Sequence, residues 1–497
     1  MLRQGIAKSS QWVFAGTVLS KPIQLFTNVI LARLLGPDSY GVMGLATSMA
    51  VTLALIASFG LGDAMTKFVA EHYQRDKESG VRYASVILWS ALCFSSVLFF
   101  TLWASQDRWR ALVFPPQVTR ATIDLCLCLA LMNLLFALLA GAFAGLQLFR
   151  DLTIFNLLQA AAVAVLATFL AFYSTEGALL AYVVGAAACI VWGVAKLLFY
   201  DRRLFRLPNL ADLAELKTII RFSLPIWVGC FFLSPVITYT FAFLARQPGG
   251  TRELGMFSTA LGLRTIVTIL PGVVGLVISP ALIQEAGAHG DFAAYENLLK
   301  KSFLSLVFLT LPLLIIFLFF GDLLFLVYGR QFASAFRLFA PLCGSVAIGA
   351  IGAPLIIAMT AKNKTWWSLG FGILKSLVLV ALTLWWVPVH LSMGLAWAFF
   401  VSEISFYLIA TEFCIGVGVM PAAIRQTFYT ACLGAGAIVL LAISLPDVAR
   451  WALALPASIL VGILMVRGYP PLTAWLSDSI PYPLRPRARS ILSFISS

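Results

Sequence analysis

The sequence predicts an all-α integral membrane protein with about 14 transmembrane helices, arranged as two parallel six-helix lobes followed by two C-terminal helices. The composition is the first observation: 61% of the 497 residues are hydrophobic and only 11% are charged, whereas soluble domains carry about 25% charged residues. The second is a succession of apolar runs of roughly 20 residues, the length that crosses a bilayer core of about 30 Å. The third is a motif near the start that returns more than 200 residues later.

The apolar runs define the expected spans in chain order. The first run is expected to be a retained span and not a cleaved signal peptide, because it has no small-residue cleavage site and carries Lys21 and Pro22 within it. The expected spans are 11–31, 40–62, 83–105, 121–145, 152–173, 177–200, 219–244, 255–283, 302–320, 334–360, 366–388, 391–416, 426–445 and 450–467.

The distribution of basic residues predicts the orientation of the chain. If the N-terminus is cytoplasmic, most of the 34 Lys and Arg residues fall on the cytoplasmic side, so we expect both ends in the cytoplasm. The same scatter argues against nucleic-acid binding despite the net charge of +13, because no concentrated basic patch occurs. The eight cysteines and three histidines show no metal-ligand spacing, so we expect neither a metal nor a cofactor.

The repeated motif predicts the domain organisation. The stretch ILARLLGPDSYGVMGLATS (Ile30 to Ser48) returns as FLARQPGGTRELGMFSTALGL (Phe243 to Leu263), at an offset of 213 residues before the turn and 214 after it. Six spans per copy is an even number, so the copies share one orientation, with a pseudo-two-fold axis along the membrane normal and a cleft between them. The expected domains are 1–205 (spans one to six), 206–420 (spans seven to twelve) and 421–497 (two further spans and a basic cytoplasmic tail). The hinge motif comprises Arg33, Gly36, Pro37, Tyr40 and Gly41, with Arg246 and Gly255 in the second copy.

The local chemistry of the hinge motif explains a break between two helices. Gly36 suits the residue just past a helix end, Pro37 stops continuation, and Asp38 or Ser39 can cap the next helix. Arg33 falls in the last turn, where a cation complements the helix dipole. The arginine is therefore expected to be structural, with substrate contact as the alternative.

Prolines inside the spans are candidate kinks. Pro22 in the first span corresponds to Pro235 in the seventh at the same offset, and each interrupts the helical hydrogen-bond ladder. Pro271 follows Arg264 by two turns, so a bend there would move the guanidinium between the two membrane faces.

Ionisable residues inside spans are candidate functional residues. A cation at bilayer depth costs at least about 2.5–3.5 kcal/mol unless it faces water or a partner. Arg264 follows Gly255 by nine residues, which is about 13 Å along a helix. The cationic candidates are Lys21, Arg264 and Lys375, and the acids that could pair with them are Glu403, Asp63 and Asp124.

The hinge motif, FSLPI (Phe222 to Ile226), SPALIQE (Ser279 to Glu285) and the six-plus-six layout together resemble Wzx-type polysaccharide exporters. These form the polysaccharide transporter branch of the multidrug/oligosaccharidyl-lipid/polysaccharide (MOP) flippase superfamily, which also contains the MATE transporters. The resemblance implies a flippase of the bacterial inner membrane that carries undecaprenyl-pyrophosphate-linked oligosaccharide from the cytoplasmic to the periplasmic leaflet. It also implies polymerase and chain-length or export proteins as partners. Fourteen spans are similar to the lipid II flippase branch, whose last two helices shape a groove for the lipid tail.

Within this resemblance the cations acquire a role. Lys21, Arg264 and Lys375 would face the cleft and hold the pyrophosphate, because a diphosphate needs charged donors and Arg offers a bidentate fork. A Lys375–Glu403 ion pair is an open alternative, as is a proton- or sodium-coupling role for Glu403. Sugar contacts would come from scattered polar side chains such as Asn28, Gln159 and Tyr239.

Two other functions compete with the flippase hypothesis. An ion-coupled small-molecule exporter of the multidrug type would need acids in its cleft, whereas cations outnumber mid-span acids here. A polysaccharide polymerase or ligase would need a sizeable outer loop with catalytic groups. The largest outer segment is only Gln106 to Arg120, and no nucleophile–base pair occurs. We therefore expect a transporter and not an enzyme.

Overall fold

A computed structural model describes residues 2–73, 75–172, 174–209, 212–287, 292–362, 364–446, 448–453 and 456–458. Helices account for nearly all of these residues, and no strand occurs among them. Contacts divide the chain into two compact units, Met1–Ser258 and Thr259–Ser497, with the boundary inside one long helix, α9. Each unit is described by itself below.

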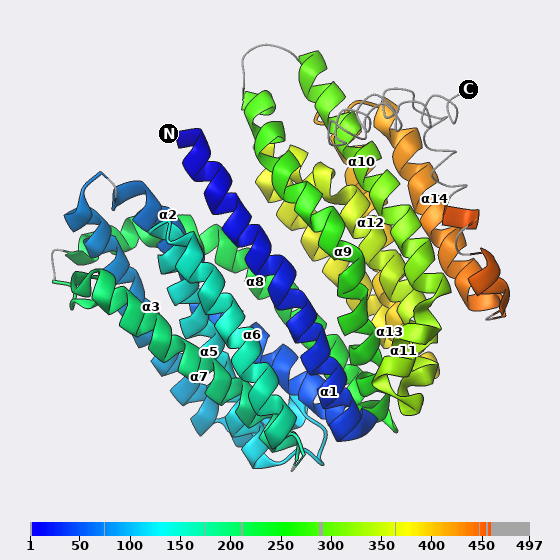
Figure 1. Ribbon diagram of the computed structural model, residues 1–497, viewed down its shortest axis with the longest axis horizontal. Coiled ribbons are helices and arrows are strands. Elements are labelled where there is room, and N and C mark those ends of the chain that lie inside the picture. The colour runs from blue at the N-terminus through cyan, green and yellow to red at the C-terminus, as the bar shows by residue number, and fades with distance from the viewer. Residues whose placement is uncertain are drawn as a thin grey trace. The chain divides into compact units, whose positions relative to one another are not determined.

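The first unit is a bundle in which α5 packs against α1, α2 and α7 (Figure 1). Polar side chains begin several of its helices. Asp76 accepts hydrogen bonds from two backbone amides at the start of α3, and Thr119 and Ser174 cap α5 and α7 in the same way. Its elements are α1 (Leu2–Ser58), α2 (Leu61–His72), α3 (Lys77–Ala104), α4 (Gln106–Val113), α5 (Arg120–Gly145), α6 (Phe149–Leu170), α7 (Thr175–Tyr200), η1 (Arg202–Phe205), η2 (Asp212–Ala214), α8 (Glu215–Ala245) and the start of α9 (Gly250–Gly287).

The long helix α1 contains the first two predicted spans, divided at Gly36. This glycine has φ 72° and ψ 173°, a conformation open essentially to glycine alone, which confirms the predicted helix break. In the described part of α1, the helical dihedral angles are interrupted at Gly36. The chain remains helical through Pro22, Pro235 and Pro271, so the break in α1 lies at the hinge motif, and bending at the prolines stays a prediction.

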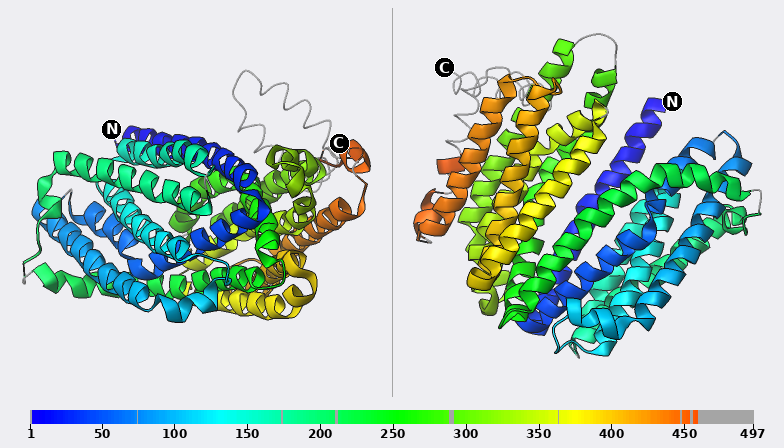
Figure 2. Two further views of the ribbon diagram at one scale, coloured as in Figure 1. Left: turned by 90° about the horizontal axis from the view of Figure 1, so that it is seen from below. Right: turned by 180° about the vertical axis from the view of Figure 1, so that it is seen from behind.

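The second unit is built around α12, which is buried along most of its length. This helix packs against α10, α13 and α14. The helices α13 and α14 run side by side in the right view of Figure 2. The long helix α13 is divided at Leu391, which has φ 49° and ψ −129°. The elements are the remainder of α9, α10 (Phe292–Phe319), α11 (Gly321–Tyr328), η3 (Arg330–Ala335), α12 (Phe336–Ala361), α13 (Thr365–Gly416) and α14 (Ala423–Ser444).

Ten helices among the described residues are long and apolar enough to cross a membrane. Two of them, α1 and α13, each contain two predicted spans, and the span predicted at 255–283 lies in α9. The predicted all-α membrane fold is therefore confirmed. The span predicted at 450–467 lies largely outside the described residues. The short helices α4 and α11 were not predicted, because eight residues are too few to form a span.

The boundary between the two compact units does not coincide with the predicted domain boundary at 205/206. The contacts group α8 with the first unit because this helix packs against the second half of α1. Packing contacts and sequence duplication are different properties of a chain. The six-plus-six division therefore stays a prediction.

Candidate functional site

The two copies of the hinge motif meet in the first unit through their glycines. A Cβ placed on Gly41 would lie 1.9 Å from the carbonyl oxygen of Thr251, and a Cβ placed on Gly255 would lie 1.9 Å from that of Pro37. Each glycine thus faces the residue four positions before the other glycine. An offset of 214 residues converts Gly41 into Gly255 and Pro37 into Thr251, so each glycine makes the same contact as its counterpart. This reciprocity is expected for helices that are related by a local two-fold axis.

Hydroxyl groups extend the hinge contact along the same helices. Thr251 donates a hydrogen bond to the Asp38 carboxylate, at 3.0 Å. Asp38 therefore connects the two copies, and a helix cap at Asp38 or Ser39 stays a prediction. Further along, the Thr52 hydroxyl lies 2.8 Å from that of Thr238 and 3.0 Å from that of Ser234, which ties the second half of α1 to α8.

The second unit holds a cation cluster, which we define as Arg264, Lys375 and Glu403. The ammonium Nζ of Lys375 lies 2.6 Å from the Glu403 carboxylate, and Arg264 interacts electrostatically with the same carboxylate. The side chains of the ion pair are 32% and 15% exposed respectively. Two cations thus face one acid, which leaves the cluster with an excess positive charge.

The surroundings of the cation cluster are aromatic and weakly polar. Arg264 donates a long hydrogen bond of 3.4 Å to the Ser345 hydroxyl and lies 5.7 Å from the ring centroid of Phe399. Lys375 lies 5.5 Å from the ring centroid of Phe406. Ring faces attract cations without neutralising them, so these aromatic contacts leave the guanidinium with its positive charge.

The other predicted charged residues belong to the first unit. Lys21 is exposed on α1 of the first unit, and its Nζ donates a 3.5 Å hydrogen bond to Gln24. Asp63 is exposed in the first turn of α2, and one carboxylate oxygen of Asp124 is buried without a hydrogen-bond partner in the described structure. Among the described residues neither acid forms an ion pair with a predicted cation. The predicted role of these two acids as partners therefore gains no support, and convergence of Lys21 with Arg264 stays a prediction.

The remaining hinge residues have structural contacts. Arg246 ends α8, where its guanidinium donates a 3.0 Å hydrogen bond to the Leu112 carbonyl. Tyr40 is 4% exposed, and Arg33 is exposed. The structural role of Arg33, with substrate contact as the alternative, stays a prediction.

A partly open cavity of about 250 Å³, with a wall of mixed polar and apolar side chains, lies in the first unit. Four amide side chains contribute to its wall, from positions on α1, α5 and α6. Two of them, Asn28 and Gln159, are the residues suggested from the sequence as sugar contacts, whereas Tyr239 is not among the lining residues and stacks on Phe243 instead. We call this the amide cavity, lined by Gln24, Thr27, Asn28, Thr47, Val51, Leu129, Asn133, Gln159, Ala160, Val163 and Tyr182.

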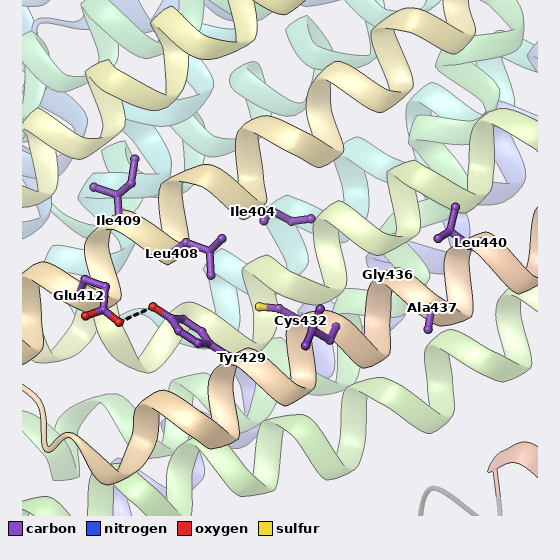
Figure 3. A pocket seen from close by; sticks show the side chains of 10 residues that line it. Ile404, Leu408, Ile409, Glu412, Tyr429, Cys432, Gly436, Ala437 and Leu440 are labelled. Carbon is purple, nitrogen blue, oxygen red and sulfur yellow. Dashed lines mark hydrogen bonds between the residues drawn. The ribbon is translucent and has the colours of Figure 1, made fainter.

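An open groove of about 940 Å³ runs between α13 and α14 of the second unit (Figure 3). Its wall is almost entirely apolar, with Leu408 and Leu440 among its lining residues. The lining residue Glu412 accepts hydrogen bonds from Tyr429, which also lines the groove, and from Arg425. A long apolar groove with a polar group at one end fits an amphiphile. We call it the apolar groove.

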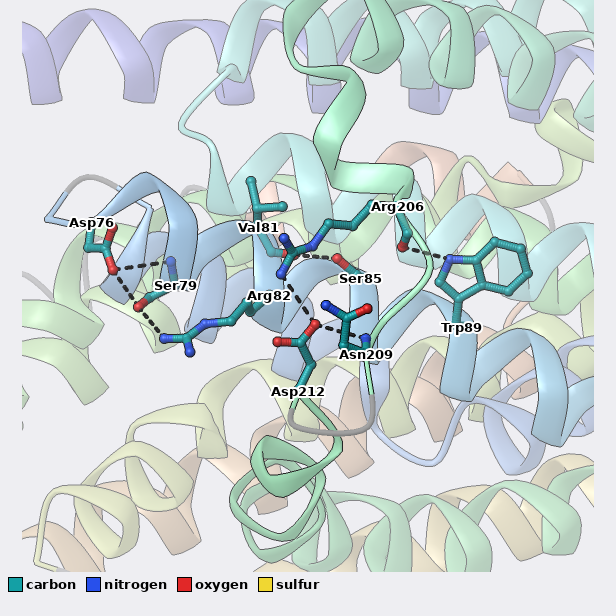
Figure 4. A network of polar contacts seen from close by, with 9 residues as sticks. All are labelled: Asp76, Ser79, Val81, Arg82, Ser85, Trp89, Arg206, Asn209 and Asp212. Atoms are coloured by element: carbon teal, nitrogen blue, oxygen red, sulfur yellow. Dashed lines mark hydrogen bonds and ion pairs between the residues drawn. The ribbon is translucent and has the colours of Figure 1, made fainter.

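The segment that joins α7 to α8 is fastened to the first unit by a polar network (Figure 4). Arg206 forms an ion pair of 3.2 Å with Asp212, and its carbonyl accepts a hydrogen bond from the Trp89 indole. At the start of the segment, the Asp201 carboxylate accepts hydrogen bonds from Arg203 and Tyr73. The Arg203 hydrogen bond lowers the pKa of Asp201, and burial together with the Asp201 contact raises the pKa of Tyr73 to about 12.

Comparison with known proteins identifies the family. Residues 6–286, more than half of the chain, match the family described as "Polysaccharide biosynthesis protein". The chain belongs to this family. A relative from Shigella flexneri, described as "Putative O-antigen transporter", is 24% identical over 333 residues, which cover 65% of this chain and 76% of the relative.

Solved structures show which fold the chain shares. It is similar to the lipid II flippase MurJ in an inward closed conformation, with a TM-score of 0.69 at 14% identity, covering 91% of this chain and 97% of that one. It is also similar to an inward-facing multidrug resistance MATE family transporter of the MOP superfamily, with a TM-score of 0.64 at 15% identity, covering 81% and 96%. The Wzx-type resemblance and the MOP fold predicted from the sequence are confirmed. These relatives are described as transporters or flippases, which supports the prediction of a transporter and not an enzyme.

Proposed function

We propose that this protein carries an undecaprenyl-pyrophosphate-linked oligosaccharide from the cytoplasmic to the periplasmic leaflet of the bacterial inner membrane. Both chain ends would be cytoplasmic, and the two lobes would alternate in giving access to a cationic cavity. Polymerase and chain-length or export proteins of the same pathway would receive the product. Family membership and the descriptions of the O-antigen transporter and lipid II flippase relatives support this proposal.

The cation cluster is the observation that carries the proposal. Glu403 can neutralise one positive charge, and the 2.6 Å contact assigns that charge to Lys375. Arg264 then remains as a cation in a predicted span, where an unpaired charge is costly. A diphosphate would offset this cost with charge-assisted hydrogen bonds, for which a guanidinium is well shaped.

The Lys375–Glu403 contact also bears on ion coupling. A carboxylate that couples transport to a proton or sodium ion must bind and release that ion. The Glu403 carboxylate is instead paired with the side-chain ammonium of Lys375, which cannot be released. We therefore favour the ion-pair role for Glu403 over ion coupling. The same contact disfavours a multidrug-type exporter of cations, which would need this acid to be open to its substrate.

The apolar groove supports a lipid-linked substrate. Its length follows two membrane-spanning helices, and its apolar wall is suited to a polyprenyl chain. At the polar end of the groove Arg425, 46% exposed, forms an ion pair of 2.9 Å with Glu412. We propose that the undecaprenyl tail lies in this groove while the head group crosses.

The test is complementation of a deletion strain. Without the protein, lipid-linked repeat units should accumulate on the cytoplasmic side, and the wild-type gene should clear them. Arg264→Ala should slow clearance about 10- to 100-fold, since a hydrogen bond to a charged group contributes about 1.5–3 kcal/mol, and Arg264→Lys should restore part of it.

Arg252→Ala is the matched control, because Arg252 is exposed near the start of the same helix. It should clear the repeat units as the wild type does at equal membrane abundance. Full clearance by Lys21→Ala combined with Arg264→Ala would overturn the pyrophosphate assignment. Absence of accumulation in the deletion strain would overturn the flippase proposal itself.

A further inference from the structure

The amide cavity in the first unit has a composition that the transport of a lipid tail or a phosphate does not explain. Its lining residues include four amides, two threonines and one tyrosine, but no charged side chain. Asn28, Asn133, Gln159 and Tyr182 have no side-chain hydrogen bond within the described part of the protein. Their polar side-chain atoms therefore have hydrogen-bonding capacity left for a ligand.

The spacing of the lining residues along their helices places them on the helix faces that line the amide cavity. Gln24 and Asn28 are four residues apart on α1, as are Leu129 and Asn133 on α5, and residues at this spacing share one helix face. The hydroxyls of Thr27 and Thr47 already donate to carbonyls of their own helix. The amides are thus the groups left to bind a ligand, and each supplies donors and an acceptor.

The chemistry indicates an uncharged ligand rich in hydroxyl groups. A metal ion or an organic cation would need a carboxylate, and an inorganic anion would need a cation, but the lining contains neither. Sugar hydroxyls both donate and accept hydrogen bonds, which is the mixture that amides match. The volume of about 250 Å³ is just below the roughly 300–1,000 Å³ of common ligand pockets, so it suits one sugar unit and not a whole oligosaccharide.

Lys21 connects this cavity to the phosphate. It lies one turn before Gln24 on the same face of α1, and its Nζ donates to the Gln24 side chain, which lines the cavity. A phosphate held by the exposed ammonium would therefore lie beside the cavity. We propose that the amide cavity binds the sugar linked directly to the diphosphate, an inference that rests on the proposed flippase function.

The experiment compares two lipids on the purified full-length protein in nanodiscs. One is the lipid-linked oligosaccharide extracted from the deletion strain, and the other is undecaprenyl diphosphate without sugar. The wild type should bind the glycosylated lipid at least about tenfold more tightly, a preference that corresponds to about 1.4 kcal/mol. Asn28→Leu combined with Gln159→Leu should abolish this preference and leave the affinity for undecaprenyl diphosphate unchanged.

Two further variants keep the experiment decisive. Gln117→Leu makes the same chemical change at an exposed turn away from the cavity and should keep the full preference. Asn133→Ala removes a third amide without adding bulk and should lower the preference severalfold, even if the double variant folds poorly. An unchanged preference in both cavity variants, or an equal loss of affinity for both lipids, would overturn the sugar site. If no lipid-linked oligosaccharide accumulates in the deletion strain, the flippase proposal fails first.

Discussion

The hinge contact provides the sharpest prediction, because glycine is required there by the neighbouring backbone. Replacing Gly41 with alanine adds a Cβ that would lie 1.9 Å from the carbonyl oxygen of Thr251. Real Cβ atoms essentially never approach closer than 3.0 Å, so the two helices must separate by about 1 Å. A side chain could rotate away from such a clash, but a backbone carbonyl within a helix cannot.

The cost can be estimated from overpacking. Extra methyl or methylene groups forced into a packed interior cost about 1–3 kcal/mol and occasionally more, and a clash with backbone on both helices belongs at the upper end. Gly41→Ala and Gly255→Ala should therefore each destabilise the protein by about 3 kcal/mol. Because the first substitution already separates the helices, the double variant should cost clearly less than the sum of the two.

Thermal denaturation of the detergent-solubilised protein measures this effect. A loss of about 3 kcal/mol should lower the melting temperature by about 5 °C for a unit of this size. Gly62→Ala is the matched control, because a Cβ there would meet its nearest neighbour, the Ala137 carbonyl oxygen, at an ordinary 3.6 Å. Equal melting temperatures for Gly41→Ala and Gly62→Ala would refute the reasoning, as would strict additivity of the two hinge substitutions.

Three other predictions follow from the site. Glu403→Gln should lower the melting temperature because it leaves Lys375 unpaired, and a variant that exchanges Lys375 and Glu403 should restore much of it. Full ion-dependent transport by Glu403→Gln in ion-clamped vesicles would exclude ion coupling at Glu403. Gly436→Trp should block the apolar groove and slow lipid transport, whereas Gly370→Trp, outside the groove, should leave transport unchanged. Neither variant should lower the melting temperature, since a Cβ at either glycine meets nothing within 4 Å. Asp201→Asn should have a lower melting temperature than the wild type at neutral pH, because the pKa of Asp201 is lowered in the folded state. The ionised carboxylate stabilises the fold at pH values above its unfolded-state pKa of about 3.9, and this stabilisation is lost as the pH falls through its folded-state pKa. The melting temperatures of the two proteins should therefore converge on acidification.

The fold was predictable because the local composition of the chain indicates each transmembrane helix. Twenty apolar residues form a span wherever they occur, and the break at Gly36 follows from a glycine and a proline side by side. The break at Leu391 lies at the first residue of the span predicted at 391–416. The short helix α4 escaped prediction because eight polar and apolar residues carry no comparable signal.

The site was predictable only in part, because it depends on which helix faces meet. Charges stand out in apolar spans, so Arg264, Lys375 and Glu403 were found, but whether the last two pair depends on the helix register of α13 across its break. Neutral amides stand out less. Spacing was the available signal for the amide cavity: Gln24 and Asn28 lie four residues apart in an otherwise apolar span.

The chemistry of the three candidate sites is the basis for the substrate that we propose. Excess positive charge in the cation cluster would suit many anions, and an apolar groove alone would suit any lipid or drug. A cavity of uncharged amides adds a preference for a neutral ligand with many hydroxyl groups. A small hydrophobic drug matches only the groove, and a free sugar phosphate matches only the two polar sites. A polyprenyl diphosphate that bears a glycan has a chemical part for each, which is why we favour it over every simpler substrate.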